Sequence, residues 1–203
     1  MNLSGLFIKK YLEFCIKQVY YFIVPFPLFK RKLTMNTKIL ENIKTTDKKS
    51  ILMLTGSVLI CLSAGLISKL AITPESLIWY EYLFKPALNP PNWLFQAVWT
   101  ILYLLMGVSL YFVVKAESPA NKKLALIVFG SQLFLNIIWA PVFFGLKSIG
   151  GGLTVTILLL ISIYLTFYKF YKISVRASVL LVPHVLWVSY AIGLNFTYWI
   201  LNA

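Results

Sequence analysis

Five apolar stretches decide what this chain can fold into. Each is long enough to cross the roughly 30 Å hydrocarbon core of a bilayer as a helix that rises about 1.5 Å per residue. Breaks that carry charges, Pro or Gly separate the stretches, and most of these breaks are short. The sequence therefore predicts an all-α membrane protein, a five-transmembrane-helix bundle in which successive helices are antiparallel. The expected spans are Ile51–Ile72, Trp93–Val114, Leu124–Leu146, Leu153–Phe170 and Val179–Leu201.

The composition agrees with this assignment. Of the 203 residues, 60% are hydrophobic and only 12% are charged, and the mean hydropathy is +0.81. Soluble domains carry roughly a quarter charged residues. No Asp or Glu follows Glu117. We therefore expect a multi-pass membrane protein, with the lipid bilayer as its surroundings. The frequent use of Lys, Ile, Asn, Phe and Tyr suggests an AT-rich genome, and we expect the membrane to be a bacterial-type cell membrane.

The net charge of +13 does not indicate a nucleic-acid partner. The basic residues lie between the apolar stretches and not on one face, which is typical of loops in membrane proteins. Cys15 and Cys61 are far apart in the sequence and lack the spacing of metal ligands. We accordingly expect no disulfide, no metal site and no nucleic acid.

The placement of Lys and Arg predicts the orientation in the membrane. Sixteen of the 19 lie on one side, in the N-terminal segment and in the 115–123 and 169–176 loops. The other side holds only Lys69, Lys85 and Lys147. Basic loops stay in the cytoplasm, so the N-terminus should be cytoplasmic and the C-terminus outside. An odd number of spans agrees with ends on opposite sides.

Residues 1–49 differ from the remainder, the domain of residues 51–202. They are basic and apolar, but charges interrupt them too often for a sixth span. Three interpretations are open: an interfacial amphipathic helix, a targeting sequence, or translation that starts at Met35, which would make residues 1–34 an artefact. We favour the last. Without residues 1–34 the bias in Lys and Arg is still 10 to 3, so the predicted orientation is unchanged.

The second span carries an aromatic face. The double proline Pro90–Pro91 suits the entry to a helix, where the first N–H groups have no intrahelical partner. Trp93 then lies at the depth of the membrane interface and is interpreted as an anchor. Phe95, Trp99 and Tyr103 recur at i, i+4 and i+8, which places them on one face. Such a face packs against other helices or forms the wall of a ligand site.

Polar and aromatic residues share a face of the third span. Gln132, Asn136, Trp139 and Phe143 are spaced so that they point the same way. Amides in hydrocarbon need partners. They either join neighbouring helices or form the polar points of an apolar pocket. Pro141 cannot donate a backbone hydrogen bond, so we expect a kink there.

The fifth span adds a third face of this kind, and Pro183 should kink the helix near its start. Together, the three spans each supply an aromatic side chain, and two of them supply an amide. A large flat apolar ligand with a few polar edges suits such an arrangement. The residues on this face are Trp187, Ala191, Leu194, Asn195 and Tyr198.

Signals of catalysis are scarce. The sequence has no paired acids, no nucleophile elbow and no phosphate-binding loop. His184 is the only histidine, and a lone histidine is more often structural than a haem ligand. Charges suited to ion relay are nearly absent from the spans, which argues against an ion-coupled transporter.

Three stretches resemble the TspO/MBR family, which comprises the tryptophan-rich sensory proteins and the translocator protein, or peripheral benzodiazepine receptor. They read KPALNPPNWLFQAVWTILYLLMG, SQLFLNIIWAPVFFG and VPHVLWVSYAIGLN, and the resemblance covers about residues 51–202. It implies a five-helix bundle with a ligand cavity open toward the first loop. The implied ligands are porphyrins and haem-type tetrapyrroles, cholesterol in animal members, and benzodiazepine-type drugs. Members often form homodimers.

The resemblance also implies site residues. Trp79 and Tyr80 match the Trp-Tyr pair of the loop that covers the cavity. The equivalents of Trp99 and Trp187 are linked to light-dependent porphyrin breakdown in bacterial members. The full set expected to bind ligand is Trp79, Tyr80, Pro90, Phe95, Trp99, Tyr103, Asn136, Trp139, Phe144, Trp187, Ala191 and Leu194.

The chain departs from the family pattern at several positions. Leu88 stands where the family has a loop tryptophan, Gln96–Ala97 stands where it has Gly-Pro, and its Trp-x-Pro-Pro stretch reads Trp139-Ala140-Pro141. We therefore expect altered contacts in the covering loop. No basic residue follows Tyr198, which lowers the expectation of sterol transport.

The leading hypothesis is a membrane sensor or regulator that binds a tetrapyrrole and needs no obligatory cofactor. The first alternative is an enzyme that degrades porphyrin in the light, for which Trp99 and Trp187 would be the catalytic candidates. The second alternative is a transporter of tetrapyrroles or lipid-like molecules.

Overall fold

The computed structural model describes residues 48–117 and 119–203, and the predictions for residues 1–47 lie outside them. Five of its helices are long and apolar enough to cross a membrane, which confirms the predicted fold. No strand occurs within the described ranges. The elements are α3 (Lys48–Lys69), α4 (Pro74–Glu81), α5 (Asn92–Lys115), α6 (Pro119–Ala140), the π-helical turn η3 (Pro141–Gly145), α7 (Ile149–Ile173), α8 (Val175–Val179) and α9 (Val182–Asn202).

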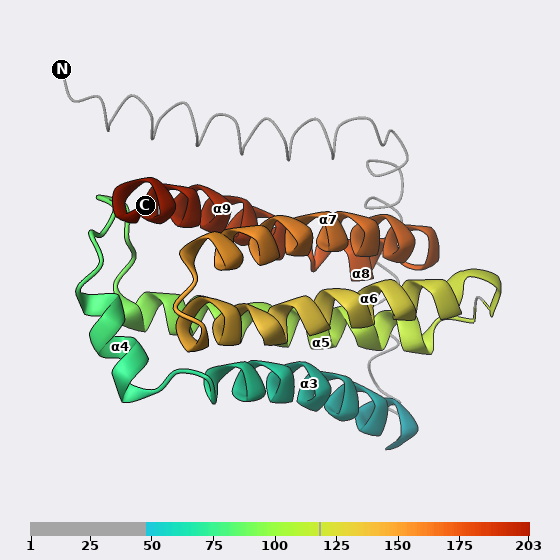
Figure 1. Cartoon of the computed structure of the whole chain (residues 1–203). Helices are drawn as coiled ribbons and strands as arrows, with labels where there is room; N and C mark the ends of the chain where they lie inside the picture. Colours follow the sequence, from blue (N-terminus) through green and yellow to red (C-terminus); the bar gives the residue numbers. More distant parts are fainter. Residues whose placement is uncertain (1–47, 118) are drawn as a thin grey trace.

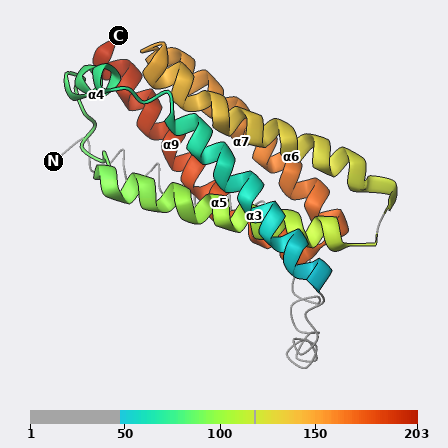
Figure 2. The same ribbon diagram turned by 90° about the horizontal axis from the view of Figure 1, so that it is seen from below.

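The long helices run side by side, and short α4 lies across one end of the bundle (Figures 1 and 2). α3 packs against α5 and α6, α6 packs against α7, and α7 packs against α9. The end that carries α4, the start of α5, η3 and the C-terminus is called the loop end below (Figure 1). α8 lies at the opposite end.

Two helix boundaries differ from the prediction because of local capping. α3 ends at Lys69 and not at Ile72, since Thr73 caps α4 in a reciprocal pair of hydrogen bonds with Ser76. α7 begins at Ile149, four residues before the predicted Leu153, because the Ser148 side chain accepts the N–H of Gly151. Apolar length alone does not reveal such caps.

The two prolines act differently. Pro141 opens the π-helical turn, in which the Leu146 N–H donates to the Pro141 carbonyl at 2.9 Å, so the predicted irregularity is confirmed. At Pro183 the predicted kink takes the form of a complete break in the fifth span. α9 begins at Val182, after the break that separates it from α8. Pro183 occupies the first helical turn, where its missing N–H costs no hydrogen bond.

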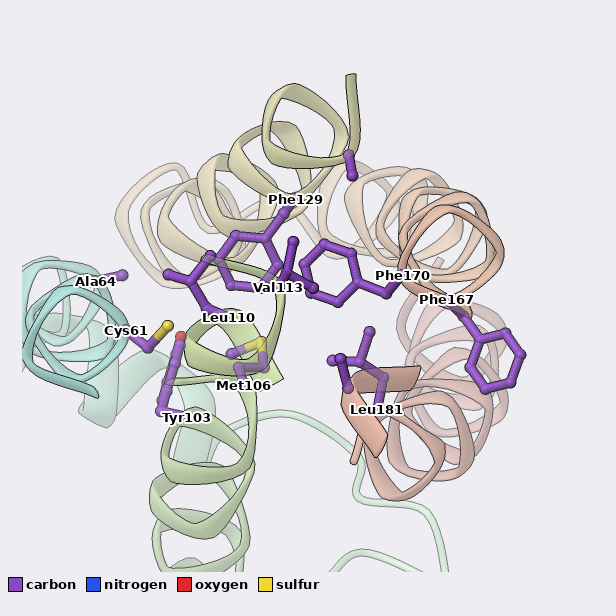
Figure 3. Packing of buried hydrophobic residues seen from close by; sticks show 12 residues of the cluster. Cys61, Ala64, Tyr103, Met106, Leu110, Val113, Phe129, Phe167, Phe170 and Leu181 are labelled. Carbon is purple, nitrogen blue, oxygen red and sulfur yellow. The ribbon is translucent and has the colours of Figure 1, made fainter. Parts of the chain in front are cut away.

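The largest buried apolar cluster lies between α3, α5, α6, α7 and the α8–α9 region (Figure 3). The Phe129 and Phe170 rings stack at 5.5 Å within it. α3 and α5 approach closely because Gly107 has no side chain: a Cβ there would lie 2.5 Å from the Val58 Cα. Gly65 similarly makes room for the Tyr103 ring. This cluster closes the bundle beneath the aromatic residues described next.

Candidate functional site

Phe95 joins three helices through its ring. Its centroid lies 6.1 Å from each of Trp99 on α5, Trp139 on α6 and Trp187 on α9. Trp99 lies 5.8 Å from Tyr103, so the aromatic face predicted on α5 is confirmed. These five residues are called the aromatic cluster. They fill the space between α5 and α9, whose backbones do not pack closely along their length.

The indole N–H groups of the cluster are not equivalent. Trp139 donates its N–H to the Thr156 hydroxyl of α7 at 2.9 Å, which fixes the orientation of its ring. The N–H groups of Trp99 and Trp187 are buried and have no hydrogen-bond partner among residues 48–117 and 119–203. Both can therefore donate to a ligand that enters the cluster.

The amides predicted on the same helical faces have different partners. The shorter Asn136 and Asn195 donate to carbonyls four residues back in their own helices, at 2.9 and 2.8 Å. Their side-chain oxygens are buried, and no described residue donates a hydrogen bond to them. Gln132 is longer and donates across helices, to the sulfur of Met106 and to His184. Amides inside a bilayer were expected to form hydrogen bonds between helices, and of these three amides only Gln132 does so.

A second aromatic layer lies toward the loop end. Phe143 of η3 stacks on Trp139 with ring centroids 5.2 Å apart and an angle of 13°. The rings of Trp79 and Tyr80 on α4 meet Phe143 edge-on. Phe144 is buried 5.6 Å from Tyr80. The π-helical turn at Pro141 therefore brings both phenylalanines beneath the covering loop.

Hydrogen bonds tie the covering loop to α9. The hydroxyls of Tyr80 and Tyr198 lie 2.7 Å apart, and Tyr80 also donates to the Asn89 side chain at 3.2 Å. Because the Tyr80 proton goes to Asn89, Tyr198 is the donor in the tyrosine pair. Asn202 of α9 makes two hydrogen bonds with the backbone of Phe84. The predicted loop pair Trp79–Tyr80 thus lies over the cluster, but sequence reasoning missed the residues that hold it there.

The remaining predicted residues border these groups. Ala191 is buried and Leu194 is half-buried, each on α9 beyond Trp187. Pro90 is half-buried in the turn that precedes α5. Trp93 exposes 71% of its surface, which agrees with its interpretation as an interface anchor.

Comparison with known proteins identifies the fold family. A sequence model of the TspO/MBR family matches residues 57–200. The chain belongs to the TspO/MBR family. It is 42% identical over 156 residues to the tryptophan-rich protein TspO of Chlorobaculum tepidum, which covers 76% of this chain and 98% of that protein. This TspO/MBR chain is therefore an integral, multi-pass membrane protein.

Other relatives of this TspO/MBR protein come from distant organisms. Protein CrtK of Rhodobacter capsulatus is 39% identical over 128 residues, which covers 61% of this chain and 78% of that protein. The human translocator protein is 35% identical over 127 residues, with coverage of 62% and 75%. The family that the sequence resembles is thus confirmed.

The departures from the TspO/MBR pattern do not disrupt the aromatic cluster. Gln96 and Ala97 are exposed on α5, whereas Phe95 and Trp99 are half-buried between the helices. Leu88 leaves much of its side chain exposed, and its backbone carbonyl accepts a hydrogen bond from the Tyr190 hydroxyl of α9. Gln96, Ala97 and Leu88 therefore lie at the outer face and in the loop, whereas Ala140 is buried beside Phe143 and Phe144.

Proposed function

We propose that this protein is a membrane sensor or regulator that binds a tetrapyrrole of the porphyrin or haem type. The observation that carries the proposal is the meeting of Phe95 with three tryptophans from three helices. Flat aromatic side chains favour offset or edge-on packing against a conjugated ring. The proposed contact residues are Trp79, Tyr80, Pro90, Phe95, Trp99, Tyr103, Asn136, Trp139, Phe144, Trp187, Ala191 and Leu194.

Unpaired polar atoms support a ligand with polar groups among apolar ones. Within the described part of the chain, four buried polar atoms have no partner: the indole N–H groups of Trp99 and Trp187 and the side-chain oxygens of Asn136 and Asn195. Buried polar groups in proteins are nearly always hydrogen-bonded. A tetrapyrrole offers both N–H donors and acceptor atoms, whereas a saturated hydrocarbon ligand would leave all four atoms unpaired.

Titration with protoporphyrin IX tests the proposal. The protein, reconstituted in nanodiscs, should shift the porphyrin absorption band and quench tryptophan fluorescence with saturation at one porphyrin per chain. Empty nanodiscs of the same lipid provide the control for partition into the bilayer. A signal that rises linearly and equally in both samples would refute binding at the cluster.

Light-dependent porphyrin degradation is the second candidate function. Trp99 and Trp187 support it, because the ring of each lies 6.1 Å from that of Phe95, so both indoles would border a ring bound there. Illumination under oxygen should then bleach bound porphyrin faster than porphyrin mixed with a protein that lacks both tryptophans. Equal rates would eliminate the enzymatic function and leave binding intact.

We also propose that the loop end faces the outside of the cell and that the N-terminus is cytoplasmic. Tyr82 at the loop end and Glu117 at the opposite end are both exposed. In a protein whose native cysteines are replaced, a membrane-impermeant maleimide added to intact cells should label Tyr82→Cys and leave Glu117→Cys unlabelled. Permeabilised cells should show labelling of both. The reverse pattern in intact cells would invert the orientation.

A further inference from the structure

A buried polar group lies below the aromatic cluster, between α5, α6 and α9. The Gln132 amide nitrogen lies 3.2 Å from the Met106 sulfur and 3.3 Å from His184 Nδ1. All three side chains are almost completely buried, with 0 to 1% of their surface exposed. His184 is also the only histidine in the whole sequence. Sequence analysis interpreted it as structural, but one of its ring nitrogens is not used by the fold.

The contacts of Gln132 determine where the His184 proton lies. The amide nitrogen has two hydrogens, and it has two neighbours that can accept them, the Met106 sulfur and His184 Nδ1. With the Gln132 amide oriented as it is in the structure, Nδ1 is the acceptor, and a neutral His184 then carries its proton on Nε2. In the described part of the chain, Nε2 is buried and has no hydrogen-bond partner. A buried donor without an acceptor is costly, so this N–H favours a ligand that supplies one.

His184 adjoins the residues proposed to contact the ligand. Its ring lies edge-on to Trp99, with centroids 5.9 Å apart. It precedes Trp187 by three residues on α9, so the two side chains lie on the same side of the helix. Met106 lies about 21 Å along α5 from Asn92 at the loop end, at 1.5 Å per residue. The His184 N–H is thus at the deep end of the aromatic cluster.

The surroundings of His184 restrict the chemistry of the acceptor. Residues 93–114, 124–140, 149–168 and 182–202, which belong to the four helices around it, contain no Lys, Arg, Asp or Glu. A carboxylate buried there would have no cation to pair with, which is strongly unfavourable in hydrocarbon. An uncharged acceptor such as a carbonyl oxygen meets no such penalty.

We propose that His184 is a specificity-determining residue, which donates its Nε2–H to an uncharged carbonyl oxygen on the buried edge of the ligand. This inference rests on the proposed tetrapyrrole binding. The hydrogen bond from His184 fixes the orientation of the ligand. With the carbonyl edge buried at His184, the charged propionates on the opposite edge face the loop end and water. This hydrogen bond also excludes His184 as an axial ligand of haem iron in this tautomer, since the nitrogen that would coordinate the metal is protonated.

Two porphyrins that differ only at the relevant edge test the proposal. Protoporphyrin IX carries two vinyl groups opposite its propionates, and diacetyldeuteroporphyrin IX carries two acetyl carbonyls in their place. The wild type should bind the diacetyl compound roughly threefold to tenfold more tightly, the range expected for one net hydrogen bond. His184→Leu should lose this preference, and His184→Gln, which retains an N–H donor, should keep part of it.

Nitrogen NMR of the unmodified protein provides a measurement that needs no variant. With ¹⁵N-labelled histidine, the single imidazole should show a proton bonded to Nε2 and none on Nδ1, and the Nε2 signal should move when the diacetyl compound binds. A proton on Nδ1, or equal porphyrin preference in wild type and His184→Leu, would overturn the role of His184 alone. Failure of both porphyrins to bind would overturn this inference together with the proposed function.

Discussion

Replacing Trp99 and Trp187 together with alanine is expected to weaken protoporphyrin IX binding by about a hundredfold or more. The two indoles belong to α5 and α9, and the ring of each lies 6.1 Å from that of Phe95. Burial of a large side chain against a ligand contributes about 1.5–3 kcal/mol, and aromatic pairing adds roughly 0.5–1.5 kcal/mol. Loss of two such contacts exceeds the roughly 2.7 kcal/mol that corresponds to a hundredfold change in affinity. Porphyrin absorbance measures the dissociation constant without relying on tryptophan emission.

Matched controls separate loss of ligand contact from loss of fold. Trp93 and Trp199 expose 71% and 45% of their surfaces, so Trp93→Ala with Trp199→Ala removes the same number of indoles from the outside of the bundle. This control pair should bind porphyrin like the wild type. The helical circular dichroism of both double variants should match that of the wild type. Wild-type affinity in a folded Trp99→Ala, Trp187→Ala protein would place the ligand elsewhere.

Gly107→Ala is expected to give the largest loss of stability among the small substitutions. A Cβ at this position would lie 2.5 Å from the Cα of Val58 and 3.1 Å from its backbone nitrogen. Because the obstacle is backbone, α3 and α5 must separate, and overpacking of this kind costs about 1–3 kcal/mol or more. The thermal denaturation midpoint in detergent should fall clearly, although alanine has the higher helix propensity.

Gly130→Ala is the matched control for this substitution. Gly130 lies within α6, and a Cβ there meets no atom within 4 Å. Its replacement should leave stability unchanged or raise it by up to about 1 kcal/mol, the difference in helix propensity. If Gly107→Ala proved as stable as Gly130→Ala, the close packing of α3 on α5 would be wrong.

The apolar pattern was sufficient to predict the five spans, because a bilayer admits few structures other than long helices. The differences lie at helix ends, where single side chains decide. Ser148 extends α7 back over three glycines, and the kink expected at Pro183 is a complete break between α8 and α9. Both effects depend on which backbone groups find a partner, and hydropathy does not report that.

Helical periodicity was sufficient to predict which residues of the candidate site share a face of one helix. Phe95, Trp99 and Tyr103 had to share a face, and they do. Partners between helices depend on how each helix is rotated and how deep it sits, which the sequence of one helix does not contain. The bond from Trp139 to Thr156 and that between Tyr80 and Tyr198 were missed for this reason.

Side-chain length explains why two neighbouring amides behave differently. Gln132 and Asn136 lie one turn apart on α6 and were expected to have similar roles. Asn136 reaches only the Gln132 carbonyl of its own helix, whereas Gln132 reaches Met106 and His184. Both amides leave their side-chain oxygen without a partner among the described residues, but only the longer one reaches the histidine.

Mass spectrometry of the small molecules that remain bound to the protein tests tetrapyrrole binding most directly. The protein would be purified in mild detergent from cells that make tetrapyrroles, in parallel with the Trp99→Ala, Trp187→Ala variant. We expect a tetrapyrrole to be released from the wild type in near-stoichiometric amount and to be depleted from the variant. A stoichiometric sterol or lipid with no tetrapyrrole, or equal tetrapyrrole in both preparations, would contradict binding at the aromatic cluster.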